Sequence, residues 1–351
     1  MSVSAFSHPY LGGLLGDEEI GRYFTAEAEI AAMLAFERAL ADAQAKAGLI
    51  PAAAAERIAH ACEAIQPDMA GLRAATARDG VVVPEFVRQL RQLAGPDAAK
   101  HIHFGATSQD VIDTALMLRV KQVCGLFLSR LGELDAEFRQ LDADFGHRPL
   151  MAHTRMQAAI LITVGDRIRA WREPLERHRE RLERVQESTF AIQLGGAAGT
   201  LDKLGDKGAA VRLAVATELG LVAAPQWQSQ RDRIAEFGSL LSLVSGSLGK
   251  FGQDIALLAQ AGEEIELSGG GGSSAMAHKQ NPVAAEALVA LARFNAVQVS
   301  GLHQSLVHEQ ERSGSAWTLE WMLLPPMILT TGASLRLAPE LARNIRSLGT
   351  S

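Results

Sequence analysis

The feature that most constrains the fold of this 351-residue sequence is an apolar period that begins at Ser108 and continues without interruption to about Phe145. Its apolar residues recur at intervals of three and four, as in Val120, Val123 and Phe127, which is the spacing of one continuous α-helix. At about 1.5 Å per residue, such a helix is roughly 55 Å long. A helix of this length buries its apolar face mainly against other long helices, so the sequence predicts a helix bundle.

Other segments with helical periodicity favour the same architecture. Long helices are expected at residues 157–188, 231–267 and 283–308, and shorter ones at residues 25–46, 51–65 and 84–93. The valines at 81–83 form the most strand-like run, and nothing alternates strand with helix as a doubly wound sheet does. Trp317, Trp321 and Leu324 are expected in the core. We therefore expect an all-α fold, an elongated bundle of long helices.

Composition and charge exclude several classes of protein. With 48% hydrophobic and 21% charged residues, the chain can bury a large core, which excludes disorder. Its 34 basic and 40 acidic residues give a net charge of −6, whereas a dedicated nucleic-acid binder has a basic excess. No apolar run reaches the ~20 residues of a membrane span, and the first residues do not resemble a signal peptide. We expect a cytoplasmic protein that binds neither nucleic acid nor membrane.

Cysteine and histidine spacing argues against a metal site. The two cysteines, Cys62 and Cys124, are too few for a disulfide framework or a cysteine zinc site. No other set of histidines, cysteines and carboxylates has the spacing of metal ligands. We expect no bound metal.

Glycine-rich polar loops separate the predicted helices, and the segment at 269–282 is the strongest motif among them. Four glycines, which predict a hinge, precede Ser273 and Ser274, two hydroxyl candidates for acid–base chemistry. Lys279 adds a cation and Asn281 a neutral donor just before a helix N-terminus, which attracts anions. A flexible linker is the alternative interpretation.

Two further loops carry groups that suit a carboxylate. Thr107 and Ser108 place two hydroxyls at the head of the long helix, where they could equally be N-caps. Arg155 offers a bidentate fork for a carboxylate and Gln157 a further donor, although both could also be ordinary surface residues. His153 lies two residues before Arg155.

Taken together, these loops resemble those of the fumarase/aspartase/argininosuccinate lyase superfamily. Its signature, GSS-x-M-x-x-K-x-N-P, matches residues 272–282, and the likeness covers nearly the whole chain. Residues 105–115, 231–237 and 311–325 are most similar to the bacterial 3-carboxy-cis,cis-muconate cycloisomerases within it. Lyases of the superfamily usually keep a histidine, a proposed general acid, at the place where Arg155 stands here. Members also usually continue into a further small helical domain beyond the place of Ser351, so the resemblance implies a truncated C-terminal domain.

The resemblance implies a reaction in which a proton is exchanged at the carbon beside a carboxylate, through an aci-carboxylate that the site must stabilise. It implies Ser273 as the catalytic acid and base, with Lys279 assisting. The remaining groups are expected to bind a polyanionic carboxylate substrate: Thr107, Ser108, His103, Arg155, Gln157, Ser274, Met276, Asn281 and Arg312. It implies no cofactor. It also implies a homotetramer whose active sites are shared between subunits, which fits the long apolar helix faces.

These observations lead to one functional hypothesis and one alternative. We expect a cycloisomerase, an intramolecular lyase that lactonises 3-carboxy-cis,cis-muconate or a close 3-substituted muconate such as 3-sulfomuconate in aromatic degradation. The alternative is a fumarate-releasing lyase acting on adenylosuccinate or argininosuccinate, which the arginine at 155 disfavours. For the domains, we expect an N-terminal helical domain (1–105), a central long-helix bundle (106–335) and a short remnant of a C-terminal domain (336–351).

Overall fold

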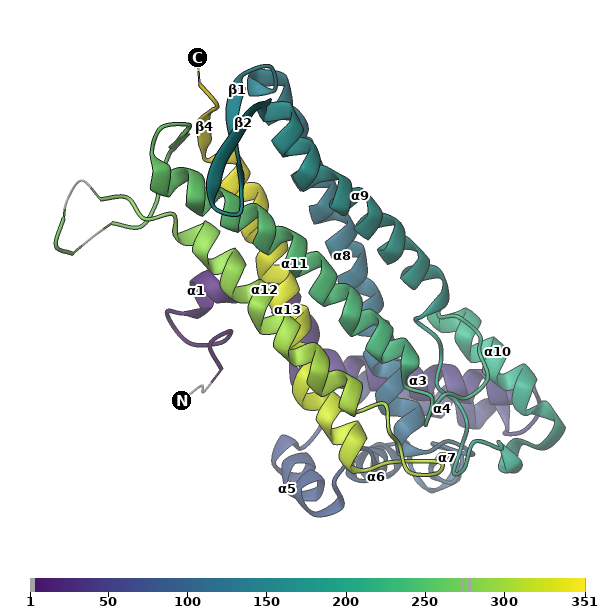
Figure 1. Ribbon diagram of the computed structural model, residues 1–351. Helices are drawn as coiled ribbons and strands as arrows, with labels where there is room; N and C mark the ends of the chain where they lie inside the picture. The colour runs from purple at the N-terminus through teal and green to yellow at the C-terminus, as the bar shows by residue number, and fades with distance from the viewer. Residues whose placement is uncertain (1–3, 273, 277–278, 351) are drawn as a thin grey trace.

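Five long helices run side by side and give the molecule its elongated shape (Figure 1). The structure is a computed structural model that describes residues 4–272, 274–276 and 279–350. The long helices are α8 (Ser108–Phe145), α9 (Val164–Ser188), α11 (Asp232–Ala261), α12 (Val283–Gln304) and α13 (Ser315–Arg343). The first of these spans the predicted residues, and the bundle of long helices is confirmed.

The bundle is held together by apolar side chains that the helical period places on facing surfaces. Phe138 of α8, Trp171 of α9 and Phe251 of α11 form one aromatic cluster with ring centroids 4.9 to 5.8 Å apart. Each of the three residues is at least 97% buried. Aromatic residues bury large apolar areas, so this cluster fixes three helices against each other.

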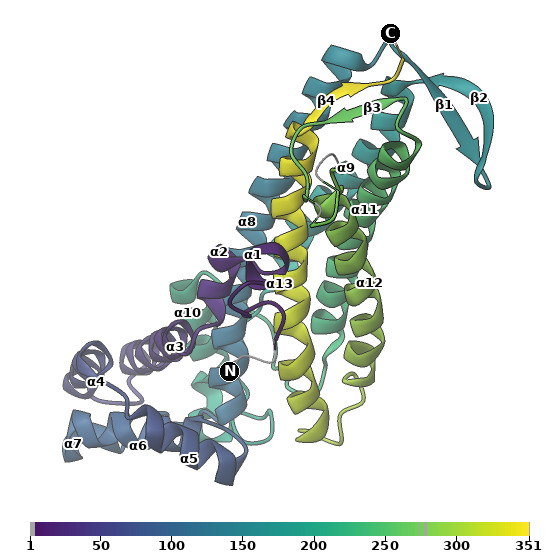
Figure 2. The same ribbon diagram turned by 90° about the vertical axis from the view of Figure 1, so that its left-hand side faces the viewer.

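Short helices gather at one end of the bundle, where Figure 2 shows α3 to α7 extending to one side. Two short helices and a 3₁₀ turn lead into this group: α1 (Gly12–Leu15), α2 (Glu18–Gly21) and η1 (Arg22–Phe24). The group itself is α3 (Ala26–Lys46), α4 (Ala52–Ala64), α5 (Met69–Asp79), α6 (Val83–Ala94) and α7 (Pro96–Ala99). Beside α3 lie η2 (Asp202–Lys207) and α10 (Gly208–Leu219). Thr25 caps α3, since its Oγ1 accepts a hydrogen bond from the Ala28 amide at 3.2 Å.

Several local predictions were wrong. The valines at 81–83 form no strand, because Pro84 suits the first turn of a helix and α6 begins at Val83. The helix expected from residue 157 begins only at Val164, since residues before it form a hairpin of β1 (Pro149–Thr154) and β2 (Gln157–Thr163). The β-branched residues of β2 favour the extended form.

A second small sheet joins the end of the chain to the bundle. β3 (Ile265–Leu267) pairs antiparallel with β4 (Ile345–Leu348) at the end of the molecule that carries the β1–β2 hairpin. The helix expected at 231–267 therefore ends at Ala261, and the expected domain boundary at residue 335 falls inside α13. The division into three domains stays a prediction.

The helix α12 has an unusual surface for a member of a single-chain bundle. By length and hydropathy it could cross a membrane, yet it packs along α11 and α13. Only 28% of its most apolar stretch is buried, and Val297 is 69% exposed. Much of the apolar surface of α12 is therefore only partly covered by the rest of the described chain.

Glycines let α11 approach α12 closely. A Cβ atom at Gly252 would lie 2.6 Å from the Ala285 carbonyl oxygen, and one at Gly249 would lie 2.5 Å from the Ala292 Cβ. Gly246, in the same helix, has nothing within 4 Å of the corresponding position and is exposed.

We predict that Gly252→Ala destabilises the protein by about 1–3 kcal/mol, because the helices must separate to admit the methyl group. The matched change Gly246→Ala should instead stabilise it by up to about 1 kcal/mol through helix propensity alone. Thermal unfolding followed by circular dichroism checks both. A Gly252→Ala variant as stable as Gly246→Ala would contradict the close packing of these helices.

Candidate active site

The first candidate residues lie at the N-terminus of α8, at the end of the bundle that carries the short helices. Thr107 is the residue before the helix, and its amide donates to Asp110 Oδ2 at 3.0 Å. Thr107 and Ser108 are half-buried, beside the first backbone amides of the helix. This is a place where a carboxylate is favoured by the helix dipole.

Asp110 ties another glycine-rich loop to this helix end. Its carboxylate is fully buried and accepts from the amides of Gly195 and Gly196 at 2.9 Å and from Gln193 Nε2 at 3.0 Å. Burial raises the pKa of Asp110 to about 6, although these hydrogen bonds favour the ionised form. The 193–200 loop is therefore fixed beside Thr107.

A buried ion cluster lies one turn further along α8. Arg231 Nη1 contacts Asp113 Oδ2 at 2.6 Å, while Arg231 Nε and Nη2 contact the two Glu320 oxygens at 2.8 and 2.6 Å. Trp317 Nε1 donates to Asp113 Oδ1 at 3.0 Å. Burial opposes ionisation of Glu320, but hydrogen bonds from Arg231 hold its pKa below the usual range. We call Asp113, Arg231 and Glu320 the buried triad; sequence reasoning did not assign them, although they lie in the three segments that resembled the cycloisomerases.

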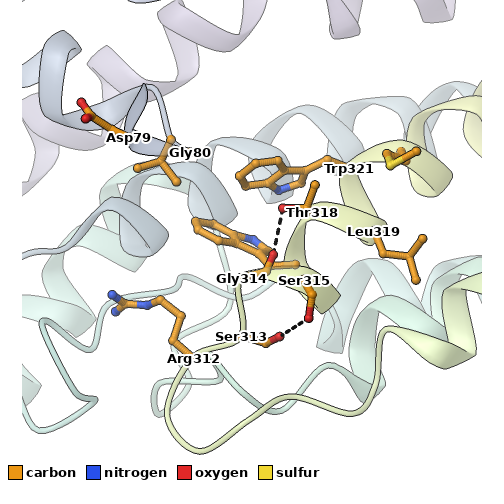
Figure 3. A pocket seen from close by; sticks show the side chains of 12 residues that line it. Asp79, Gly80, Arg312, Ser313, Gly314, Ser315, Thr318, Leu319 and Trp321 are labelled. Carbon is orange, nitrogen blue, oxygen red and sulfur yellow. Dashed lines mark hydrogen bonds between the residues drawn. The ribbon is translucent and has the colours of Figure 1, made fainter. Parts of the chain in front are cut away.

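Arg312 lies in a pocket beside the start of α13. Its Nε donates to Gln109 Oε1 at 3.0 Å and its Nη2 to the Ala197 carbonyl at 3.1 Å. The pocket holds about 670 Å³, a size typical of small-molecule sites. Figure 3 shows Arg312 before the helix, Trp321 on the helix, and Asp79 and Gly80 opposite them.

The other walls of this pocket combine hydroxyls with indoles. Ser313, Ser315 and Thr318 supply the hydroxyls, and the rings of Trp317 and Trp321 meet with centroids 4.7 Å apart. Of the three residues expected in the core, Trp317 and Leu324 are buried, whereas Trp321 is half-buried and lines the pocket. A polar substrate with a flat conjugated body fits such a lining.

His103 is also at this end, but its imidazole is already engaged. Its Nδ1 lies 2.6 Å from Oε1 of Glu37, a buried carboxylate on α3 that the sequence analysis did not single out. Its backbone has a positive φ of 62°, which is uncommon outside glycine. This contact fixes His103 to the N-terminal helices, and its expected contact with substrate stays a prediction.

Arg155 occupies the tip of the β1–β2 hairpin. Thr154 pairs with Gln157, which leaves Arg155 and Met156 as a two-residue turn with φ values of 47° and 66°. Such turns normally use Asn-Gly, because side chains strain the left-handed backbone. Strain of this kind clusters at functional sites, and here it presents an exposed guanidinium at a defined point. His153 and Gln157 are exposed on the same hairpin. The segment with His153, Arg155 and Gln157 therefore lies in a hairpin, and not directly before a helix as the helix expected from residue 157 implied.

The signature loop leaves the bundle between β3 and α12. Two backbone hydrogen bonds of 2.9 Å join Gly271 to Asn281, so the excursion runs only from residue 272 to residue 280. Ser274, Met276 and Lys279 are exposed, and Asn281 is half-buried. Ser273, the expected catalytic residue, lies outside the described residues. Among the described residues, no cluster of histidine, cysteine and carboxylate side chains has the makeup of a metal site.

The three motifs do not meet within one chain. Thr107 precedes α8 and the β1–β2 hairpin follows it, so the 38 residues of this helix hold them about 57 Å apart. Even if the six-residue β1 pointed straight back along the bundle, it would recover only about 20 Å. Thr107, Ser108 and Arg312 come together at one end, whereas Arg155 and Gln157 belong to the other.

The comparisons with known proteins agree with this fold. The family model described as "Lyase" matches residues 17–301. A 3-carboxy-cis,cis-muconate cycloisomerase from Pseudomonas aeruginosa is 40% identical over 90% of this chain and 70% of its own. The structure of a 3-carboxy-cis,cis-muconate lactonizing enzyme from Pseudomonas putida has a TM-score of 0.90 and 35% identity over 96% of this chain and 77% of its own. The structure of a fumarate lyase from Mesorhizobium has a TM-score of 0.87 and 32% identity, and the match covers 95% of this chain and 76% of its own. The chain therefore belongs to the lyase family, whose members here are enzymes of the fumarase superfamily.

Proposed function

We propose that this protein is a cycloisomerase that closes 3-carboxy-cis,cis-muconate, or a close 3-substituted muconate, to a muconolactone in aromatic degradation. The observation that carries the proposal is Arg155, held at the tip of a strained hairpin where lyases of the superfamily usually keep a histidine acid. A guanidinium stays protonated at working pH, so it binds a carboxylate and does not donate a proton to a leaving group. Lactone formation has no leaving group that needs one. Relatives named for this reaction support the same choice.

The reaction can be written with the residues of the three motifs. One substrate carboxylate forms a C–O bond to a carbon of the conjugated double bond, and the π electrons move toward the neighbouring carboxylate. The resulting aci-carboxylate is stabilised by donors and cations, for which Thr107, Ser108, Arg312 and Arg155 are the candidates. Ser273 then delivers a proton to the adjacent carbon, assisted by Lys279. Gln157, Ser274, Met276, Asn281 and His103 complete the proposed substrate contacts. The chemistry requires no cofactor.

A fumarate-releasing lyase is the second candidate, and the neighbouring structure titled fumarate lyase favours keeping it. A screen of the purified protein by ultraviolet absorbance separates the two. We expect turnover of 3-carboxymuconate or 3-sulfomuconate and no fumarate from argininosuccinate or adenylosuccinate. Fumarate release without lactonisation would overturn the proposed function.

For the catalytic serine, we expect Ser273→Ala to lower kcat at least ~100-fold with little change in KM, as loss of a general acid does. Ser274→Ala is the matched control: it removes the same hydroxyl from the neighbouring residue and should cost less. Steady-state kinetics on the muconate found in the screen measures both. Reversed effects of the two serines would show that Ser274 is the acid.

We further propose that the enzyme is a soluble, cytoplasmic homotetramer with active sites shared between subunits. Two observations support this. The Thr107 and Arg155 motifs follow opposite ends of α8, which is about 57 Å long, and β1 can recover only about 20 Å of that distance, so one chain cannot bring them to one substrate. The apolar stretch of α12, of which only 28% is buried within the chain, offers a surface for association.

Mixing two inactive variants tests the shared site. Arg155→Ala disables the hairpin motif and Arg312→Ala the pocket beside the N-terminus of α8, so each variant alone should be nearly inactive. Co-expressed, they should recover up to about a quarter of wild-type activity, because some sites then combine two intact segments from different subunits. Light scattering coupled to size-exclusion chromatography should give four chains. An active monomer, or no recovery on mixing, would contradict the shared site.

A further inference from the structure

The side-chain amide of Gln109 connects the buried triad to the pocket. It is completely buried in the first turn of α8. Its Nε2 donates to Asp113 Oδ2 at 3.1 Å and to the Gln228 carbonyl at 2.8 Å. Its Oε1 accepts from Arg312 Nε at 3.0 Å. All the partners of Nε2 are acceptors, so the amide has one possible orientation, with its oxygen toward Arg312.

The triad makes this orientation rigid. Arg231 holds Asp113 through two contacts, and Glu320 holds Arg231 through two more. Displacing any member would leave an unpaired charge in the core, which is strongly unfavourable. The position of the Gln109 oxygen is therefore set by helices α8, α11 and α13 together.

Arg312 receives its position from that oxygen. It is exposed and belongs to the loop before α13, so by itself its long side chain would sample many rotamers. Gln109 Oε1 and the Ala197 carbonyl hold Nε and Nη2, while no described residue accepts from Nη1. Two nitrogens are thus anchored on the protein, and the third is left for an anion in the pocket.

We infer that Gln109 is a positioning residue for substrate binding: it fixes the Arg312 guanidinium in the pocket and transmits to it the rigidity of the buried triad. A glutamine suits this role because it donates to a carboxylate on one side and accepts from a guanidinium on the other. Glutamate in its place would repel Asp113. The inference rests on the proposed role of Arg312 as a carboxylate ligand.

A double-mutant cycle tests the inference. Gln109→Met keeps the volume and removes the hydrogen bonds, so KM should rise roughly 10- to 100-fold, the effect of one hydrogen bond to a charged group, with kcat changed less. In an Arg312→Ala background the same change should alter KM less than ~3-fold, because the residue it positions is gone. Gln140→Met, on an exposed part of the same helix, is the matched control and should change neither constant.

Two further measurements keep the test decisive. If Gln109→Met does not fold, Gln109→Asn replaces it in the cycle. Asparagine keeps the amide but is one methylene too short to reach Arg312. The same cycle measured on citrate binding by calorimetry needs no turnover, so it separates this inference from the proposed reaction.

The outcomes are distinct. If the two substitutions have coupled effects on citrate affinity but the enzyme lactonises no muconate, the positioning role of Gln109 is supported and the proposed reaction is overturned. Independent effects of the two substitutions, or a loss confined to kcat, would overturn the positioning role. Wild-type citrate affinity no better than that of Arg312→Ala would overturn it as well.

Discussion

The ion cluster of Asp113, Arg231 and Glu320 sets the geometry on which the rest of this structure depends. Each charge comes from or immediately precedes a different long helix, α8, α11 or α13, and all three side chains are at most 1% exposed. Charges buried to this degree are tolerated only as a complete, hydrogen-bonded set. The three helix ends can therefore slide or rotate against each other only by breaking it. The relative positions of the residues at this end of the bundle are fixed as a consequence.

The length of the helices is the second constraint: the ion cluster holds residues together, whereas the long helices hold residues apart. The long helices hold the end with Thr107 and Arg312 away from the end with the hairpin. If these groups serve one site, as proposed, they can meet only between copies of the chain in a symmetric assembly. The part of the apolar stretch of α12 that is not buried within the chain is consistent with such an assembly.

Features of the fold that depend on residues close together in the sequence could be predicted, whereas features that depend on residues far apart in the sequence could not. The apolar period from Ser108 to Phe145 is local and strong, and it marked α8 correctly. The signature at 272–282 was specific enough to identify the superfamily, and hence the fold. The hairpin at 149–163 was missed because Ile160 and Leu161, exposed on β2, fit a helical period as well as a strand. The valines at 81–83 have strand propensity, but the proline after them and the packing of α6 decided otherwise.

The candidate site was predicted only in its exposed parts. Arg312, Thr107 and Arg155 carry groups whose chemistry is visible in the residue type. The partners that hold them are 119 to 204 residues apart in pairs such as Gln109 with Gln228 and Asp113 with Trp317, and no pattern in one sequence links them. Glu37 illustrates the same limit, since its contact with His103 spans 66 positions and depends on how α3 crosses the loop.

In the proposed assembly, the hairpin that carries Arg155 would link substrate affinity to the association of subunits. A two-stranded ribbon is at best marginally stable alone in water, and β2 leaves Ile160 and Leu161 more than 60% exposed. If neighbouring copies cover these side chains, association supplies the free energy that holds the strained turn in shape. Substrate affinity and subunit association then become linked equilibria: each substrate bound at the tip tightens the assembly, and dilution weakens binding before it unfolds the bundle.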